Sequence, residues 1–170
     1  KYLKGLSIYN DNSITFPNWI VGFKNLESLS IGFYQYRNKG DNYLNYSNVF
    51  KTLTQLPNLK SLSINYLYAL KGNYDNVLLK NLEKLEIRAG NIEDKNQFFR
   101  FLSNQKKITD LNLSIGGLDT LKNDLIKLKF LKSLVINGVN DSLVVDFDMK
   151  ALKNLEKISL TSFKRISTKM

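Results

Sequence analysis

The feature that most constrains the fold is a short apolar pattern, L-x-x-L-x-[IL], that returns along the whole chain. The clearest copy covers residues 59–64, with the sequence LKSLSI. The copies are separated by 23, 33, 23, 26, 23 and 24 residues, and they begin at Leu3, Leu26, Leu59, Leu82, Ile108, Leu131 and Leu155. Repeats of this length are typical of solenoids, in which each unit contacts only its neighbours.

Each copy predicts a short β-strand with one buried face. The alternation of apolar and polar residues puts two apolar side chains on the same side of an extended segment. Because every repeat returns to the same edge, the strands are expected to pair in parallel as one curved sheet. The expected strands cover residues 6–8, 29–31, 62–64, 85–87, 111–113, 134–136 and 158–160.

The segments between these strands predict short helices on the other side of the sheet. Apolar residues recur at helical spacing in residues 47–56, 96–103 and 120–128. The 23-residue steps leave room for only a single turn or a 3₁₀ segment, as expected at residues 16–20. We expect Trp19, within that segment, to lie in the core.

The segment that precedes each strand also recurs, which makes the repeat pattern more specific. Residues 53–64 (LTQLPNLKSLSI) resemble a leucine-rich repeat of the short kind found in internalin-like surface proteins and in intracellular scaffold proteins. The resemblance covers nearly the whole chain. It implies an α/β repeat solenoid, a right-handed coil with a curved parallel sheet on the concave side and short helices or 3₁₀ turns on the convex side.

The chain departs from that family pattern at one position. Three residues after the last apolar strand residue, the pattern expects an Asn whose side chain bonds neighbouring loop backbones. Other residues stand there, namely Asp11, Tyr34, Leu67, Gly90, Gly116, Val139 and Phe163. We therefore expect the loops after the strands to satisfy their backbone groups in another way.

The length of 170 residues fits one domain, so we expect residues 1–170 to form a single leucine-rich repeat domain of about seven repeats. The first residue is Lys1 rather than Met, and neither end carries an obvious polar cap. We therefore expect a fragment of a longer protein that lacks its terminal caps. The chain has no run of about 18 apolar residues, so the sequence predicts no membrane span. A secreted or cell-surface location and a cytoplasmic one both stay open.

Composition argues against an enzyme. The chain contains no Cys and no His, which removes the commonest general acid–base group, thiolate chemistry and most zinc sites. It has no glycine-rich phosphate loop. Asp146 and Asp148 are an acidic pair, but no further ligands accompany them at a regular spacing. We expect no catalytic residues, no cofactor and no metal.

The net charge of +10 permits an anionic partner, and a column of lysines two residues before the repeat Leu concentrates it. Most of the excess is Lys, whereas Arg supplies the bidentate fork that base and phosphate recognition favours. This disfavours nucleic acid and anionic lipid as partners. The column consists of Lys24, Lys80, Lys106, Lys129 and Lys153.

Two surfaces are candidates for binding another protein. One is the concave face, formed by the outward strand positions, which are mostly small and polar; its candidate residues are Tyr9, Ser30, Ser63, Asn65, Glu86, Arg88, Asn112 and Asn137. The other is a group of tyrosines at the strand ends and in the long insertion, namely Tyr34, Tyr36, Tyr43, Tyr46, Tyr66, Tyr68 and Tyr74. The alternative for the tyrosines is that their rings only fill space over the loops.

From these observations we expect a protein–protein interaction module without catalytic activity, and this expectation rests on the family resemblance. One alternative is the targeting arm of a larger enzyme or sensor whose active part lies elsewhere. Another is an anion-binding module that uses the lysine column.

Overall fold

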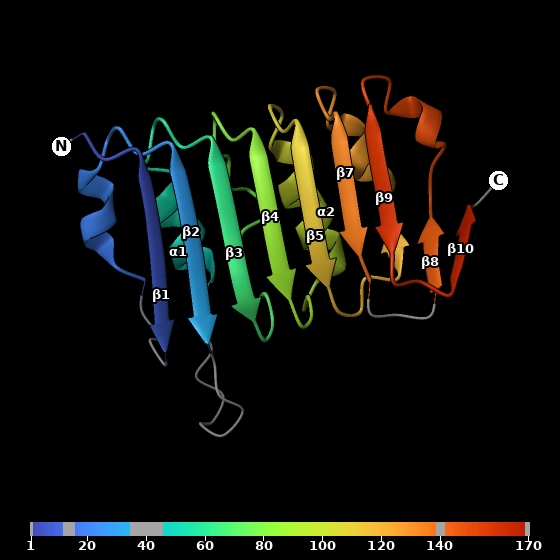
Figure 1. Ribbon diagram of the computed structural model, residues 1–170, viewed down its shortest axis with the longest axis horizontal. Coiled ribbons are helices and arrows are strands. Elements are labelled where there is room, and N and C mark those ends of the chain that lie inside the picture. Colours follow the sequence, from blue (N-terminus) through green and yellow to red (C-terminus); the bar gives the residue numbers. More distant parts are fainter. Residues whose placement is uncertain (1, 12–15, 35–45, 139–141, 169–170) are drawn as a thin grey trace.

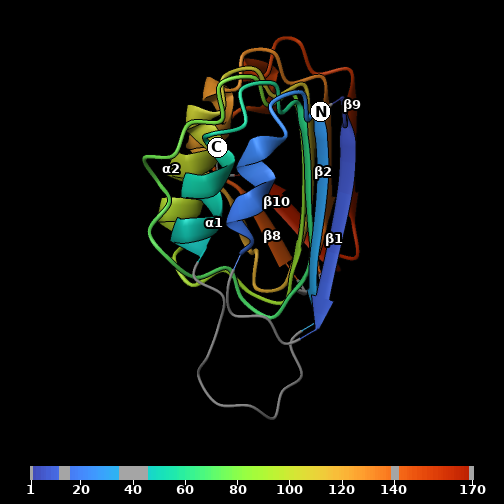
Figure 2. The same ribbon diagram turned by 90° about the vertical axis from the view of Figure 1, so that its left-hand side faces the viewer.

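The computed structural model describes residues 2–11, 16–34, 46–138 and 142–168. It has two layers, a parallel sheet on one side and short helices on the other (Figures 1 and 2). The outer strands stand farther from the helices than the central ones, so the open face of the sheet is concave (Figure 2). The expected α/β repeat solenoid is confirmed.

The main sheet contains one strand from each copy of the repeat, in chain order (Figure 1). All neighbours pair in parallel, and equivalent repeat positions face each other, as Leu29 does Leu62 and Ile31 does Ile64. Every predicted strand is present and extends beyond its predicted core. The strands are β1 (Gly5–Asp11), β2 (Ser28–Tyr34), β3 (Ser61–Leu67), β4 (Lys84–Ala89), β5 (Asp110–Ile115), β7 (Ser133–Asn137) and β9 (Lys157–Thr161).

Stacking of the repeats buries the apolar strand positions. In β2, β3, β4, β5 and β7 the two inward side chains are at most 1% exposed. Burying one such side chain contributes roughly 1.5–3 kcal/mol, and no single repeat has a second layer to bury it against. The core is therefore continuous along the solenoid, and stability depends on contacts between neighbouring repeats.

The convex layer holds two α-helices and three 3₁₀ helices among the described residues. The helices α1 (Tyr46–Leu53) and α2 (Lys95–Asn104) confirm two of the three helix predictions. At the start of α2, the Asp94 carboxylate accepts a hydrogen bond from the Gln97 amide at 2.9 Å, which satisfies one free N–H of the first turn. The 3₁₀ helices are η1 (Asn18–Gly22), η2 (Asn123–Lys127) and η3 (Met149–Ala151).

The third helix prediction, residues 120–128, is only partly correct, because this segment contains a 3₁₀ helix rather than an α-helix. Its first two residues form strand β6 (Thr120–Leu121), and the rest is η2. The 23-residue step leaves too little chain for a longer helix. β6 joins β8 (Ser142–Val145) and β10 (Arg165–Thr168) in a second parallel sheet behind the C-terminal end of the main sheet (Figure 1).

The prediction that Trp19 lies in the core is also wrong, because its side chain is 58% exposed. Its five-residue 3₁₀ helix turns only one side toward the sheet, and Ile20 occupies that side at 0% exposure. Trp19 instead packs edge-on against Phe23, with ring centroids 5.9 Å apart.

An asparagine ladder exists, but on the edge that leads into the strands. Asn58 donates its side-chain amide to the carbonyl oxygen of Lys24 at 2.8 Å, and Asn154 donates to that of Lys129 at 2.6 Å. Each bond reaches the same position of the preceding repeat. Side-chain amides thus tie neighbouring coils together one residue before the repeat Leu, where the sequence carries a column of Asn.

Candidate functional site

The candidate site is the open face of the main sheet, where one side chain from each strand stands in a central column. The first three members of this column are Ser7, Ser30 and Ser63, paired in register across β1, β2 and β3. Small side chains leave this half of the face smooth. Tyr9 rises at its edge with 56% of its side chain exposed, and its hydroxyl lies 3.4 Å from that of Ser30.

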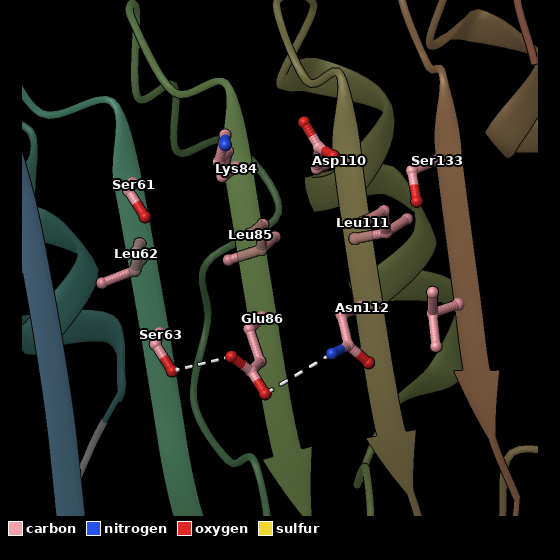
Figure 3. Close-up of a pocket in the computed structure, with 11 residues that line it drawn as sticks. Ser61, Leu62, Ser63, Lys84, Leu85, Glu86, Asp110, Leu111, Asn112 and Ser133 are labelled. Atoms are coloured by element: carbon pink, nitrogen blue, oxygen red, sulfur yellow. Dashed lines mark hydrogen bonds between the residues drawn. The ribbon is translucent and has the colours of Figure 1, made fainter. Parts of the chain in front are cut away.

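The middle of the face carries a polar network centred on Glu86 of β4. Its carboxylate accepts hydrogen bonds from the Ser63 hydroxyl at 3.3 Å and the Asn112 amide at 3.5 Å, so the network spans β3, β4 and β5 (Figure 3). Arg88 donates its Nε to the same carboxylate at 2.8 Å, and Asn65 donates to the Ser63 hydroxyl at 2.8 Å. The network joins five of the predicted site residues.

A shallow hollow of about 290 Å³ lies over this network. Glu86 and Asn112 line it together with the neighbouring Lys84 and Asp110 (Figure 3). Asp110 accepts a hydrogen bond from the Thr109 hydroxyl at 2.8 Å. Lys84 and Asp110 were not among the candidate residues, although they occupy outward positions of the same strands and share the alternation that identified Glu86.

The last of the concave-face candidates, Asn137, lies toward the C-terminal end of the face. It is half-buried in β7, and its side-chain oxygen accepts a hydrogen bond from the Thr161 hydroxyl of β9. Asn137 lies two strands away from Glu86, on the strand next to β5, and no hydrogen bond found among the described residues joins it to the network. The face thus carries a smooth part, a polar network and a separate polar pair.

The tyrosine surface is only partly present. Tyr68 is 49% exposed, as expected of a contact residue. Tyr46 and Tyr74, however, are 2% and 1% exposed and belong to the core. Tyr34 and Tyr66 lie within β2 and β3, but their side chains lie outside the described part of the structure, as do Tyr36 and Tyr43 as a whole.

The buried tyrosines belong to an aromatic cluster under the convex layer. The ring of Phe50 lies 5.3 Å from Tyr74 and 4.7 Å from Phe101, joining α1 to α2. Burial raises the pKa of Tyr46 and of Tyr74, and the nearby carboxylate of Asp94 raises the latter further. The spacing of Tyr46, Val49, Phe50 and Leu53 carried this signal, since residues i, i+3, i+4 and i+7 share one helix face.

Charges along the strand entrance are largely paired. Glu27 lies between Lys4, at 2.9 Å, and Lys60, at 3.3 Å, and these two ammonium groups lower the pKa of its carboxyl. Lys132 pairs with Glu156 at 3.0 Å. At the position after the repeat Leu, Lys and Glu alternate from one repeat to the next, so their charges largely cancel.

The lysine column lies on the surface as expected, and all five of its members are exposed. Two of them use their ammonium groups on the protein itself. Lys24 donates to the carbonyl oxygen of Gln55 at 3.3 Å, and Lys106 donates to that of Ser103. Each of these bonds occupies one of the three N–H donors of its ammonium group, while the positive charge remains.

The described residues contain no cluster of three or more acidic side chains that could hold a metal ion. Asp148, one of the acidic pair, accepts a hydrogen bond from the Lys150 amide at 2.9 Å and caps η3. No helix in the described ranges is long and apolar enough to cross a bilayer.

Comparison with known proteins supports the fold. A leucine-rich repeat protein from Leptospira interrogans aligns with 90% of this chain at a TM-score of 0.54 and 23% sequence identity. The aligned chain spans 41% of the length of that protein. No family model matches the chain, and no curated protein matches it. The repeat pattern, the stacked parallel strands and this similarity show that the chain has the leucine-rich repeat fold, a repeat solenoid.

Proposed function

We propose that this chain is a recognition module that binds another protein through the concave face of its sheet, without catalysis. The observation that carries the proposal is the Glu86 network, which holds polar side chains of three strands in fixed positions beside a smooth row of serines. A surface whose side chains are already ordered loses less conformational entropy on binding.

The two parts of the face serve different purposes. The serines leave room for a partner that brings large side chains of its own. Arg88 favours one orientation of a bound partner, because Glu86 holds its Nε in place while 59% of its side chain stays exposed to solvent. Arg is enriched among the residues that dominate binding energy at protein interfaces. A partner with a carboxylate or carbonyl group above Arg88 fits this arrangement best.

The composition supports a role without catalysis. The whole chain has no His and no Cys, so a Ser–His pair, a Cys nucleophile and a histidine metal site are absent. The carboxylate of Glu86 accepts hydrogen bonds from three neighbouring side chains, which gives it a role in ordering the face.

The proposal can be tested by affinity capture from the native extract at low and high salt, followed by mass spectrometry. The purified chain is the bait, beside a variant in which Lys80, Lys129 and Lys153 are changed to Gln. We expect both baits to retain the same discrete protein at both salt concentrations. Retention of nucleic acid or lipid alone, lost at high salt and lost with the Gln variant, would instead support the anion-binding alternative.

A further inference from the structure

A large apolar side chain is exposed on the edge that leads into the strands. Phe130 stands directly before the repeat Leu, at the position where Asn58, Asn81 and Asn154 bond to their preceding coils. The side chain of Phe130 is 57% exposed. The strand of its coil, β7, pairs with β5 on one side and with β9 on the other (Figure 1). The ring therefore stays exposed although its coil has a neighbour on both sides.

Lysines surround this ring. Lys129 directly precedes Phe130, and Lys132 follows it two residues later. In the preceding coil, Lys106 and Lys107 occupy the positions equivalent to Lys129 and Phe130. The two coils are stacked in register, with their strands roughly 5 Å apart, so all five residues lie in one small area. All five are exposed, and we call them the basic patch.

The charge of the basic patch is mostly unpaired. The alternation of Lys and Glu after the repeat Leu is interrupted here, because Thr109 stands at this position in the preceding coil. Lys106 and Lys107 donate hydrogen bonds to uncharged oxygens, so their charges remain. Lys129 makes no ion pair with any residue that the structure describes. Lys132 pairs with the Glu of the following coil at 3.0 Å. The patch thus combines an apolar ring with an excess of positive charge.

This combination fits the surface of an anionic bilayer better than other anionic partners. Surfaces that bind at the membrane interface combine Lys or Arg with Phe, Trp or Leu, and clustered lysines are attracted to anionic headgroups. Nucleic acid recognition favours Arg, which the patch lacks, and single strands stack successive bases on several rings, whereas the patch has one. Lys is depleted at protein interfaces. Lysines alone are weak evidence for a lipid partner, and the exposed ring of Phe130 is the additional observation.

We propose that the basic patch docks this chain on an anionic membrane surface, with the ring of Phe130 entering the headgroup region and the lysines binding lipid phosphates. The turns that lead into the strands lie side by side along one edge of the sheet (Figure 1), so docking leaves the concave face open. The concave face would then be presented beside a membrane. Because the patch and the concave face share no residue, this docking is tested separately from the proposed function.

Sedimentation with lipid vesicles tests the docking. Vesicles of phosphatidylglycerol and phosphatidylcholine in equal amounts are compared with vesicles of phosphatidylcholine alone. We expect the chain to bind only the anionic vesicles and to be released as the salt concentration rises. Phe130→Asn should weaken this binding at least about tenfold. It should keep the fold, which circular dichroism checks, because four other coils carry Asn at this position.

Two lysine variants separate the patch from the rest of the surface. Lys129→Gln should weaken binding to the anionic vesicles about fivefold, the usual effect of one lysine near such a surface. Lys51→Gln is the matched control, because Lys51 is an exposed lysine of α1 on the convex side. It removes the same charge and should leave binding nearly unchanged.

A fluorescence measurement locates the contact. In the double variant Trp19→Phe, Phe130→Trp, the single Trp of the chain stands in the basic patch. Its emission should shift to shorter wavelength with anionic vesicles and be quenched by brominated lipid. Absence of this shift overturns the proposal, as does absence of vesicle binding at low salt. Equal binding by wild type, Phe130→Asn and Lys129→Gln also overturns it, because the net charge of the whole chain would then explain the attraction. Binding to an oligonucleotide but not to vesicles would assign the patch to nucleic acid instead.

Discussion

The side-chain amide of Asn81 donates a hydrogen bond to the carbonyl oxygen of Pro57, 2.7 Å away in the preceding repeat. Asn58 and Asn154 make the equivalent bond to their own preceding repeats. These bonds explain how the solenoid holds its coils together although the Asn of the family pattern is missing after the strands. The asparagine side chains that bond neighbouring repeats therefore lie before the strands rather than after them.

Changing Asn81 to Ala should lower the free energy of unfolding by about 1 kcal/mol, because the Pro57 carbonyl loses its partner and Lys107 loses the side-chain oxygen that it contacts at 2.7 Å. Urea unfolding followed by circular dichroism measures the change. Asn76→Ala is the matched control, since Asn76 is an exposed asparagine in a turn. Equal effects of the two substitutions would show that the ladder does not contribute.

Changing Gln105 to Leu should destabilise the protein, although four other repeats carry Leu at this position. Gln105 is fully buried, accepts a hydrogen bond from the Leu79 amide and donates to the carbonyls of Val77 and Phe101, each at 2.8 Å. Leu would leave these groups unsatisfied, at a cost of about 1–3 kcal/mol for each one that finds no other partner. An increase in the urea midpoint for Gln105→Leu would contradict this account.

Changing Gly138 to Ala should lower the free energy of unfolding by about 1–3 kcal/mol, the usual cost of overpacking a buried site. A Cβ at this buried position would lie 2.1 Å from the ring of Phe163. Gly22→Ala is the control, because no atom lies within 4 Å of its added Cβ. In a Phe163→Ala background the extra cost of Gly138→Ala should largely vanish; if it persists in full, the ring is not the cause.

Stability should fall at high pH because two tyrosines are buried in neutral form. Burial raises the pKa of Tyr46 and Tyr74 above the ordinary value of 10.0, which the unfolded chain retains. Their contribution is complete below pH 10 and is lost as the pH rises toward the raised values, by up to about 1.4 kcal/mol per pH unit for each residue. Unfolding midpoints from pH 8 to 11 measure the loss. A Tyr46→Phe, Tyr74→Phe double variant should show a flatter profile, and an unchanged slope would contradict the assignment.

The strands could be predicted because their signal is local. Two apolar residues in each copy require one buried face, and the fixed register of Leu29 with Leu62 follows from repeating the same pattern. The helices were harder to predict because their length depends on the number of residues between one strand and the next, which differs from repeat to repeat. Residues 120–121 therefore pair with β8 instead of beginning a helix.

The candidate site was predicted as columns of residues rather than as a network. Alternation along each strand places Ser63, Glu86 and Asn112 on one face and in one row. It does not determine that the Glu86 carboxylate accepts bonds from both neighbours, because that depends on side-chain length and on the spacing of strands. For the tyrosines the sequence predicted too large a surface. Tyr46 and Tyr74 were candidates for a contact surface but are buried in the core, because a tyrosine ring is as suitable for a core as for an interface.

The most direct test of the proposed concave binding face compares two variants that each add one positive charge. Ser63→Arg places a long side chain in the network of the concave face, whereas Asn48→Arg places it at an exposed position of α1 on the convex side. Binding of the captured partner is measured by calorimetry with both variants shown to be folded. We predict that Ser63→Arg weakens binding at least about tenfold, or 1.4 kcal/mol, and that Asn48→Arg leaves it unchanged. Unchanged binding by Ser63→Arg would contradict the account.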